Sequence, residues 1–180
     1  MENKLYTVTI FSENHVGLLS VVSSVFTRRQ LNIETLSVSA SAIKGIHKFT
    51  VTTYTNEATI MKIITQIDKR VDILKSYYNT DEGLIYQEIA LYKVSTHKLL
   101  ALGSIESWVR NYGIRILDIN ETYIVFEKTG HTEETQALFD DLNNRMEVLQ
   151  FIRSGKIAIT KSKVERLSDM LKQMQKKLDK

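Results

Sequence analysis

The sequence predicts an α+β protein with two consecutive modules of β-α-β-β-α-β order, followed by a C-terminal helix. Three observations indicate this fold class. Segments that alternate apolar and polar residues are separated by segments whose apolar residues recur every three or four positions. The order found in residues 1–78 returns in residues 85–160, after a polar linker at 79–84. Residues 161–180 instead carry apolar residues at heptad spacing.

The first module is expected to contain four strands and two helices. Its strands alternate apolar with polar residues or are rich in β-branched residues, at 6–10, 32–40, 48–54 and 71–75. Its helices carry apolar stripes at helical spacing and are expected at 18–29 and from Asn56 to Ile67. This order folds as a split βαβ sandwich, in which two helices cover one face of a four-stranded antiparallel sheet.

The second module repeats this order without obvious sequence identity. Its strands are expected at 85–94, 114–119, 123–126 and 148–159, the last one interrupted at Ser154-Gly155. Its helices are expected at 99–112, which Gly113 ends as a cap, and at 133–145. Both modules are therefore expected to be ferredoxin-like.

Residues 161–180 are expected to form an amphipathic basic helix whose apolar seam packs on protein, because a lone helix of this length is marginal in water. The seam consists of Val164, Leu167, Leu171, Met174 and Leu178. This segment also accounts for the net charge of +3. It contains seven Lys or Arg against three Asp or Glu, whereas the other 160 residues contain 17 against 18.

Composition limits the function classes. Apolar and charged contents of 43% and 25% are ordinary for a globular protein. The absence of cysteine excludes disulfides and thiolate chemistry. No apolar run approaches the roughly 20 residues of a membrane span, and residues 1–4 lack the form of a signal peptide. We therefore expect a cytoplasmic protein without a membrane partner.

RNA-binding modules share the β-α-β-β-α-β order and stack bases on aromatic residues of their central strands. The central strands of the first module offer only Tyr6 and Phe49, without the Gly-aromatic run of such modules. A nucleic-acid-binding body would also need a basic face, and the near-neutral body offers none in its composition. Nucleic acid is therefore not expected as a partner.

The stretch from Ser12 to Ser20 joins the first strand to the first helix and contains Asn14-x-x-Gly17. Glycine lets the backbone turn sharply or approach a bound molecule closely. The first N–H groups of a helix have no internal partner, and such a helix start attracts carboxylates. A simpler interpretation is a strand-to-helix turn capped by the side chain of Asn14.

The sequence contains no constellation that indicates catalysis or metal binding. Its four histidines, at positions 15, 47, 97 and 131, lie on different expected elements without metal-ligand spacing. Glu133-Glu134 and Asp140-Asp141 fall on one expected helix, where a solvated face and the helix dipole explain them. There is no nucleophile elbow, P-loop or dinucleotide fingerprint. We therefore expect that the protein is not an enzyme.

Several stretches in order, over about residues 4–160, form a further pattern. They are Asn14-x-x-Gly17-x-Leu19-x-x-Val22, Phe26-x-x-Arg29-x-x-Asn32-Ile33-Glu34, Val71-Asp72-Ile73-Leu74, Glu88-Ile89-x-Leu91-x-Lys93-Val94 and Phe151-Ile152-Arg153-Ser154-Gly155. This pattern resembles the acetolactate synthase (acetohydroxyacid synthase) small regulatory subunit, whose N-terminal module is an ACT domain. The Asn-Ile-Glu strand start and the late Phe-Ile-Arg-Ser-Gly are its most specific parts.

The resemblance implies a non-catalytic partner of the large subunit that makes acetolactate for valine, isoleucine and leucine biosynthesis. Small subunits of this family activate the large subunit and confer feedback inhibition, commonly by valine. Thiamine diphosphate, Mg and FAD are then expected only on the catalytic partner, with no cofactor in this chain. The family's ACT domains dimerise side by side and hold the effector at the interface, which implies a homodimer or larger assembly. The matching effector-binding positions are Asn14, His15, Val16, Gly17, Leu18 and Leu19 of one chain and Asn32 and Ile33 of the other.

Two departures from the family pattern bear on the effector. Gln30 stands where the family usually has a glycine in a tight turn before Asn32, and His15-Val16 replaces an acidic-small or acidic-Pro pair. The sequence thus leaves open which amino acid is the effector, and also the stoichiometry and the partner of the C-terminal helix. Two alternatives remain: a stand-alone tandem ACT sensor that regulates another enzyme or transcription, and a structural activator without a ligand.

Overall fold

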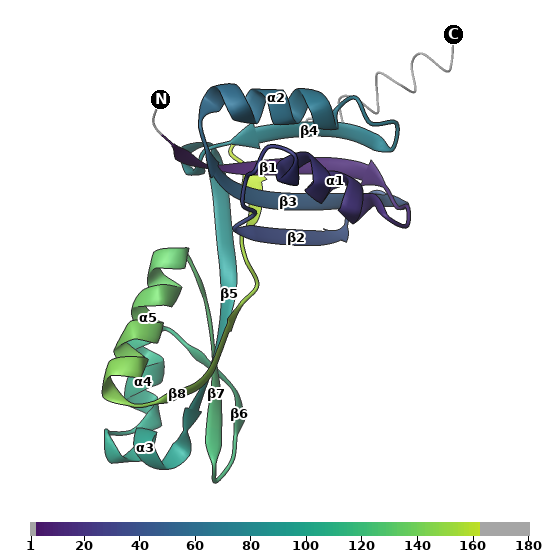
Figure 1. Cartoon of the computed structure of the whole chain (residues 1–180). Coiled ribbons are helices and arrows are strands. Elements are labelled where there is room, and N and C mark those ends of the chain that lie inside the picture. The colour runs from purple at the N-terminus through teal and green to yellow at the C-terminus, as the bar shows by residue number, and fades with distance from the viewer. Residues whose placement is uncertain (1–2, 163–180) are drawn as a thin grey trace. The chain divides into compact units, whose positions relative to one another are not determined.

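The structure, a computed structural model, describes residues 3–162. The chain divides into two compact units, the first made of residues up to Tyr86 and from Lys156 onward, the second of Gln87–Gly155. Each unit contains an antiparallel sheet with helices on one face (Figure 1). This arrangement confirms the predicted pair of ferredoxin-like modules. The seam expected in the C-terminal helix, from Val164 to Leu178, lies outside the described residues.

The first unit is built on one four-stranded sheet. Its strands are β1 (Lys4–Glu13), β2 (Thr35–Ala40), β3 (Ile46–Thr55) and β4 (Ile73–Asn79), in the spatial order β2-β3-β1-β4. Two helices, α1 (Leu18–Thr27) and α2 (Glu57–Ile67), cover one face of it (Figure 1). The core lies between the two layers, where Val8 of β1 and its opposite residue Val51 of β3 are fully buried.

The ends of the two helices follow from local chemistry. The side chain of Asn56 accepts a hydrogen bond from the Thr59 N–H at 3.0 Å and begins α2, as predicted. Helix α1 ends at Thr27, two residues before the predicted end. Gln30 then adopts a φ of +54°, and it is the only residue other than glycine with positive φ in residues 3–162. This left-handed conformation, which glycine adopts without strain, turns the chain toward β2.

The second unit has the same spatial order, β6-β7-β5-β8. Its strands are β5 (Leu84–Ser95), β6 (Arg115–Ile119), β7 (Tyr123–Gly130) and β8 (Val148–Arg153), and its helices are α3 (Thr96–Ala101), α4 (Ile105–Tyr112) and α5 (Thr132–Arg145). Tyr92 is fully buried at the centre of the core, where its hydroxyl donates a hydrogen bond to the Thr135 carbonyl at 2.7 Å.

Two elements of the second module differ from the predictions. The single helix expected at 99–112 is the pair α3 and α4, because Gly103 has a φ of +144° and Ser104 caps a new helix. The closing strand expected at 148–159 is also two strands, since β8 ends before Gly155, which has a φ of +76°, and β9 (Ile157–Thr160) follows. The cap predicted at Gly113 is confirmed.

Strand β9 belongs to the return segment, which we define as residues 156–162 and which lies in the first unit. It pairs with β5, which begins in the first unit and continues into the second. Lys48 of β3 donates a hydrogen bond to the Ala158 carbonyl at 2.7 Å. The Lys161 N–H donates to the Gly83 carbonyl, at the end of the short 3-10 helix η1 (Asp81–Gly83), at 3.0 Å. Residues from both ends of the sequence therefore complete the first unit.

Candidate functional site

The turn between β1 and α1 is formed at Gly17, whose φ is +87°. A Cβ built on Gly17 would meet no atom of residues 3–162 within 4 Å, so among these residues the space beside it is open and a side chain there would strain only the backbone. The side chain of Asn14 does not cap α1, and its main-chain N–H donates to the Gly45 carbonyl at 3.1 Å. The simpler interpretation, a helix start capped by Asn14, is therefore wrong.

No side chain of the described residues caps the start of α1. The Leu18 N–H donates to the His15 carbonyl at 3.4 Å, and no hydrogen bond within residues 3–162 uses the N–H of Leu19 or Ser20. No acidic residue lies in the first turn of the helix. The positive end of the helix dipole and these free N–H groups therefore point to a place where a carboxylate is favoured.

The side chains of the turn divide into exposed and buried ones. His15 Nε2 lies 3.1 Å from a carboxylate oxygen of Glu13, and both side chains are 56% exposed, so this pair contributes little to stability. Val16 is fully exposed. Leu18 is buried in the core, so a ligand can reach only its main chain, whereas Leu19 is about half exposed.

The other two predicted site residues follow the far end of α1. Asn32 is exposed, and its carbonyl accepts a hydrogen bond from the Thr53 hydroxyl at 2.6 Å, while Ile33 packs half-buried against the core. The 10 residues of α1 separate Gly17 from Asn32, and a helix of that length spans about 15 Å. One chain thus does not bring the two halves of the predicted site together.

The two edges of the first sheet differ in a way that the sequence did not predict. The Asp68 carboxylate accepts hydrogen bonds from the N–H and the hydroxyl of Ser76 on β4, at 2.8 and 2.7 Å. This side chain occupies the edge of β4. Strand β2 pairs only with β3 within residues 3–162, so its outer edge is available for another strand.

Several motif residues of the second unit have structural roles. Glu88, which is 3% exposed, accepts hydrogen bonds from the hydroxyls of Thr132 and Thr135 at the start of α5 and lies 3.6 Å from Arg153. The Ser154 N–H donates to the Ile89 carbonyl at 2.9 Å. These contacts tie β5, β8 and α5 together, so they explain the motif residues without a ligand.

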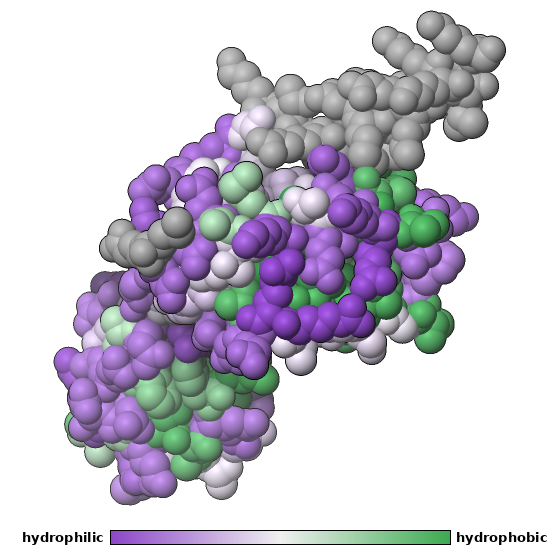
Figure 2. Space-filling model, turned by 45° about the horizontal axis from the view of Figure 1, so that its top comes forward, coloured by the Kyte–Doolittle hydropathy of each residue, from purple (hydrophilic) through white to green (hydrophobic). Residues whose placement is uncertain are grey.

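The rest of the described surface offers neither a metal site nor a membrane-spanning helix. Apolar and polar side chains are interspersed on both units (Figure 2), with exposed apolar residues such as Val71 and Ile152. Within residues 3–162, no three His, Asp or Glu side chains gather as metal ligands. The helices in that part of the chain are too short or too polar to cross a membrane.

Comparison with known proteins gives concordant matches for both units. Residues 8–75 match the family of AHAS small subunit-like ACT domains, and residues 87–162 match the family "Small subunit of acetolactate synthase". The acetolactate synthase small subunit of Buchnera aphidicola is 29% identical over 154 residues, which cover 86% of this chain and 97% of the relative. That of Mycolicibacterium smegmatis is 25% identical over 156 residues, or 87% of this chain and 91% of the relative.

A solved structure shares the fold. The crystal structure of the acetolactate synthase small subunit from Thermotoga maritima superimposes with a TM-score of 0.76 at 23% identity, and the match covers 89% of this chain and 99% of that one. At this identity the likeness concerns the fold alone, and it extends through both ferredoxin-like units.

Proposed function

Since the chain belongs to the acetolactate synthase small-subunit family, we propose that it binds and activates the catalytic subunit of acetolactate synthase and makes that enzyme sensitive to a branched-chain amino acid. In this proposal the chain is regulatory and performs no chemistry. Thiamine diphosphate, Mg and FAD are carried by the catalytic partner, and valine is the effector to be tested first.

The uncapped start of α1 is the observation that supports an amino-acid effector. The N–H groups of Leu19 and Ser20, which no hydrogen bond within residues 3–162 uses, suit the carboxylate of a zwitterion, and the space beside Gly17, open among those residues, lets it approach the backbone. The ammonium group would need oxygen acceptors, which the exposed side chain of Asn32 offers. Because α1 separates these groups within one chain, the proposed pocket combines Asn14 to Leu19 of one protomer with Asn32 and Ile33 of its partner.

The two edges of the first sheet support a homodimer that would bring the two halves of this pocket together. Asp68 occupies the edge of β4, whereas the outer edge of β2 is unpaired within the described residues. Side-by-side pairing of two β2 strands would satisfy their main-chain groups and join two first units. Only Glu34 separates Asn32 and Ile33 from the start of β2 at Thr35, so this pairing would place them near the junction of the two protomers.

Reconstitution with the catalytic subunit tests the proposal, using the wild-type chain and the variants Gly17→Asp, Gly17→Asn and Asn14→Ala. All four should raise the turnover of the catalytic subunit. Gly17→Asp places a carboxylate beside the effector's own and should abolish inhibition by valine, since one lost charged hydrogen bond costs about 1.5–3 kcal/mol. Gly17→Asn has the same shape without the charge and should keep part of the inhibition, as should Asn14→Ala.

The outcomes separate the alternatives. A catalytic subunit whose turnover does not change across a titration with the wild-type chain would contradict the proposed function and favour a stand-alone sensor. Activation without a response to valine, leucine or isoleucine would identify a structural activator. Undiminished inhibition in Gly17→Asp would place the effector pocket away from the turn that precedes α1.

A further inference from the structure

A groove on the first unit offers an unassigned binding surface. It has a volume of about 660 Å³ and runs along the outer face of α2, beside the residues that follow α1. Three cationic side chains line it, Arg29, Lys62 and Lys69, and none of the described residues that line it is acidic. Ala58 and the half-exposed Met61 add apolar surface. The groove is therefore both cationic and partly apolar.

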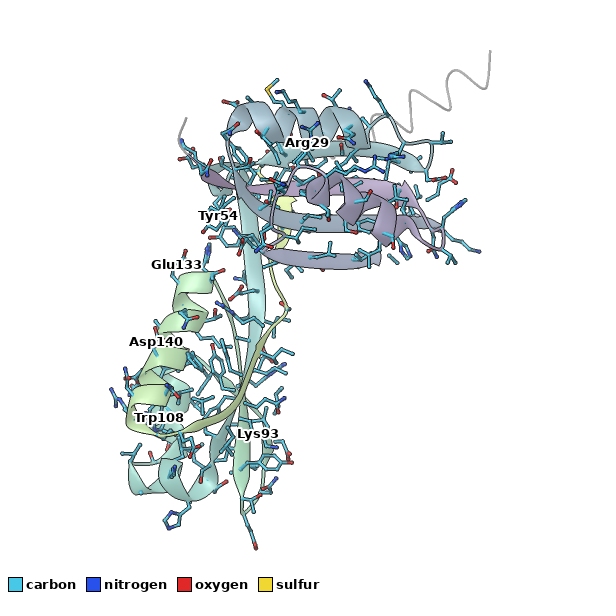
Figure 3. The ribbon with its side chains drawn as sticks, viewed as in Figure 1. Arg29, Tyr54, Lys93, Trp108, Glu133 and Asp140 are labelled. Carbon is cyan, nitrogen blue, oxygen red and sulfur yellow. The ribbon has the colours of Figure 1, made fainter. Side chains whose placement is uncertain are left out.

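Arg29 is held in the groove by packing and one hydrogen bond. Its Nη2 donates to the side-chain oxygen of Gln66 on α2 at 3.2 Å, and Arg29 lies beside α2 in Figure 3. Its Nε is buried and has no hydrogen-bond partner within residues 3–162. No carboxylate in that part of the chain forms an ion pair with Arg29, Lys62 or Lys69. Arg29 as a whole is only partly buried, so the guanidinium that Gln66 orients can meet an incoming carboxylate, although its buried Nε cannot.

The sequence of residues 163–180 does not complement the charge of this groove. Residues 163–180 contain six Lys or Arg and three Asp or Glu, so their charge has the same sign as that of the groove. A small anionic ligand also fits poorly, because the groove is open along the helix and would leave most of such a ligand in water. An acidic protein segment that carries an apolar residue for the Met61 surface matches both the charge and the shape.

We propose that the groove along α2 binds an acidic segment of the catalytic subunit. This inference rests on the proposed function, which requires a contact between the two subunits. Arg29, which lines the groove, is also close in the sequence to both parts of the proposed effector site. Arg29 lies three residues before Asn32, and Gly17 lies at the opposite end of α1. An effector that binds at either place alters a segment which leads directly to Arg29.

The test compares two double variants that change the net charge equally. Lys62→Glu/Lys69→Glu reverses two charges of the groove. Lys4→Glu/Lys44→Glu reverses two exposed lysines of the same unit that do not line it. Affinity for the catalytic subunit is measured by titration of its activity at several salt concentrations. The groove variant should bind at least about tenfold more weakly and lose most of the salt dependence, whereas the control variant should resemble the wild type.

Two further measurements identify the cause of any change. Circular dichroism and the mass of the free chain in solution should be the same for all three proteins.

Equal affinity of the groove variant and the wild type for the catalytic subunit would overturn the inference while the proposed function stands. Equal weakening in both variants would overturn it too, because the effect would then be one of overall charge. A changed self-association with unchanged affinity would assign the groove to a second copy, and a wild-type chain that does not bind the catalytic subunit would refute both proposals.

Discussion

The ion pair between Lys156 and Asp81 holds the return segment on the first unit and yields a quantitative prediction. The Lys156 ammonium lies 2.7 and 2.9 Å from the two carboxylate oxygens of Asp81 and 3.8 Å from the centre of the Tyr86 ring. The Lys156 side chain is 5% exposed, whereas that of Asp81 is 38% exposed. When the pair is broken, water can therefore solvate the Asp81 carboxylate much better than the Lys156 ammonium.

This asymmetry predicts unequal effects of the two single substitutions. Asp81→Asn leaves a buried ammonium without its carboxylate and should destabilise the first unit by about 2–3 kcal/mol, slightly less than a fully buried pair would lose. Lys156→Met keeps most of the apolar stem and leaves Asp81, which water can reach, so that about 1–2 kcal/mol should be lost. The double variant should resemble Lys156→Met, since no ammonium remains to be stranded.

Urea unfolding gives the stabilities of the four proteins. Hydrogen exchange at the Lys161 N–H, which donates to the Gly83 carbonyl at 3.0 Å, reports separately on the return segment. Exchange there should accelerate most in Asp81→Asn. A larger loss of stability in Lys156→Met than in Asp81→Asn would show that water screens both partners alike, and the argument from burial would then be refuted.

Two further predictions concern one residue of each unit. Burial raises the pKa of Tyr92 above its ordinary value of 10, and the charge of Glu88 adds to this shift. The folded state therefore keeps a proton that the unfolded state releases, so that stability is retained below about pH 10 and falls as the pH rises through the folded pKa. Tyr92→Phe should cost about 1 kcal/mol at neutral pH and reduce this alkaline loss in urea unfolding at pH 8 to 11. Asp68→Ala should expose the edge of β4 and cause concentration-dependent association in sedimentation, whereas Asp68→Asn, which keeps an acceptor for Ser76, should not.

The sequence predicted the elements whose signals are local. Asn56 marks the start of α2 because its side chain caps the helix within three residues, and Gly113 marks the end of α4 because only one residue must turn. The apolar stripe of 99–112 gives no sign that the helix is interrupted at Gly103, because residues on both sides of the interruption contact the same core. Periodicity reports which side of a segment is buried, not where the backbone is interrupted.

Features that depend on a distant partner were not predictable. The sequence predicted residues 157–159 as the end of one closing strand of the second module, whereas the separate strand β9, its partner β5 and its place in the first unit follow from tertiary structure. Asp68 follows α2 as an ordinary charged residue, and only the fold shows that it occupies the edge of β4. At the candidate site, the glycine turn was recognisable from sequence. The absence of a cap at Asn14 was not, because an Asn side chain at this spacing is equally compatible with capping.

The placement of β9 has a consequence for the order in which the protein forms during synthesis. The ribosome releases the second unit, Gln87–Gly155, before it releases the return segment that completes the first unit. About 70 residues must be synthesised after the first part of the first unit before β9 and Lys156 can join it, while all parts of the second unit are contiguous in the chain. Vectorial synthesis thus favours the earlier completion of the module that begins later in the sequence.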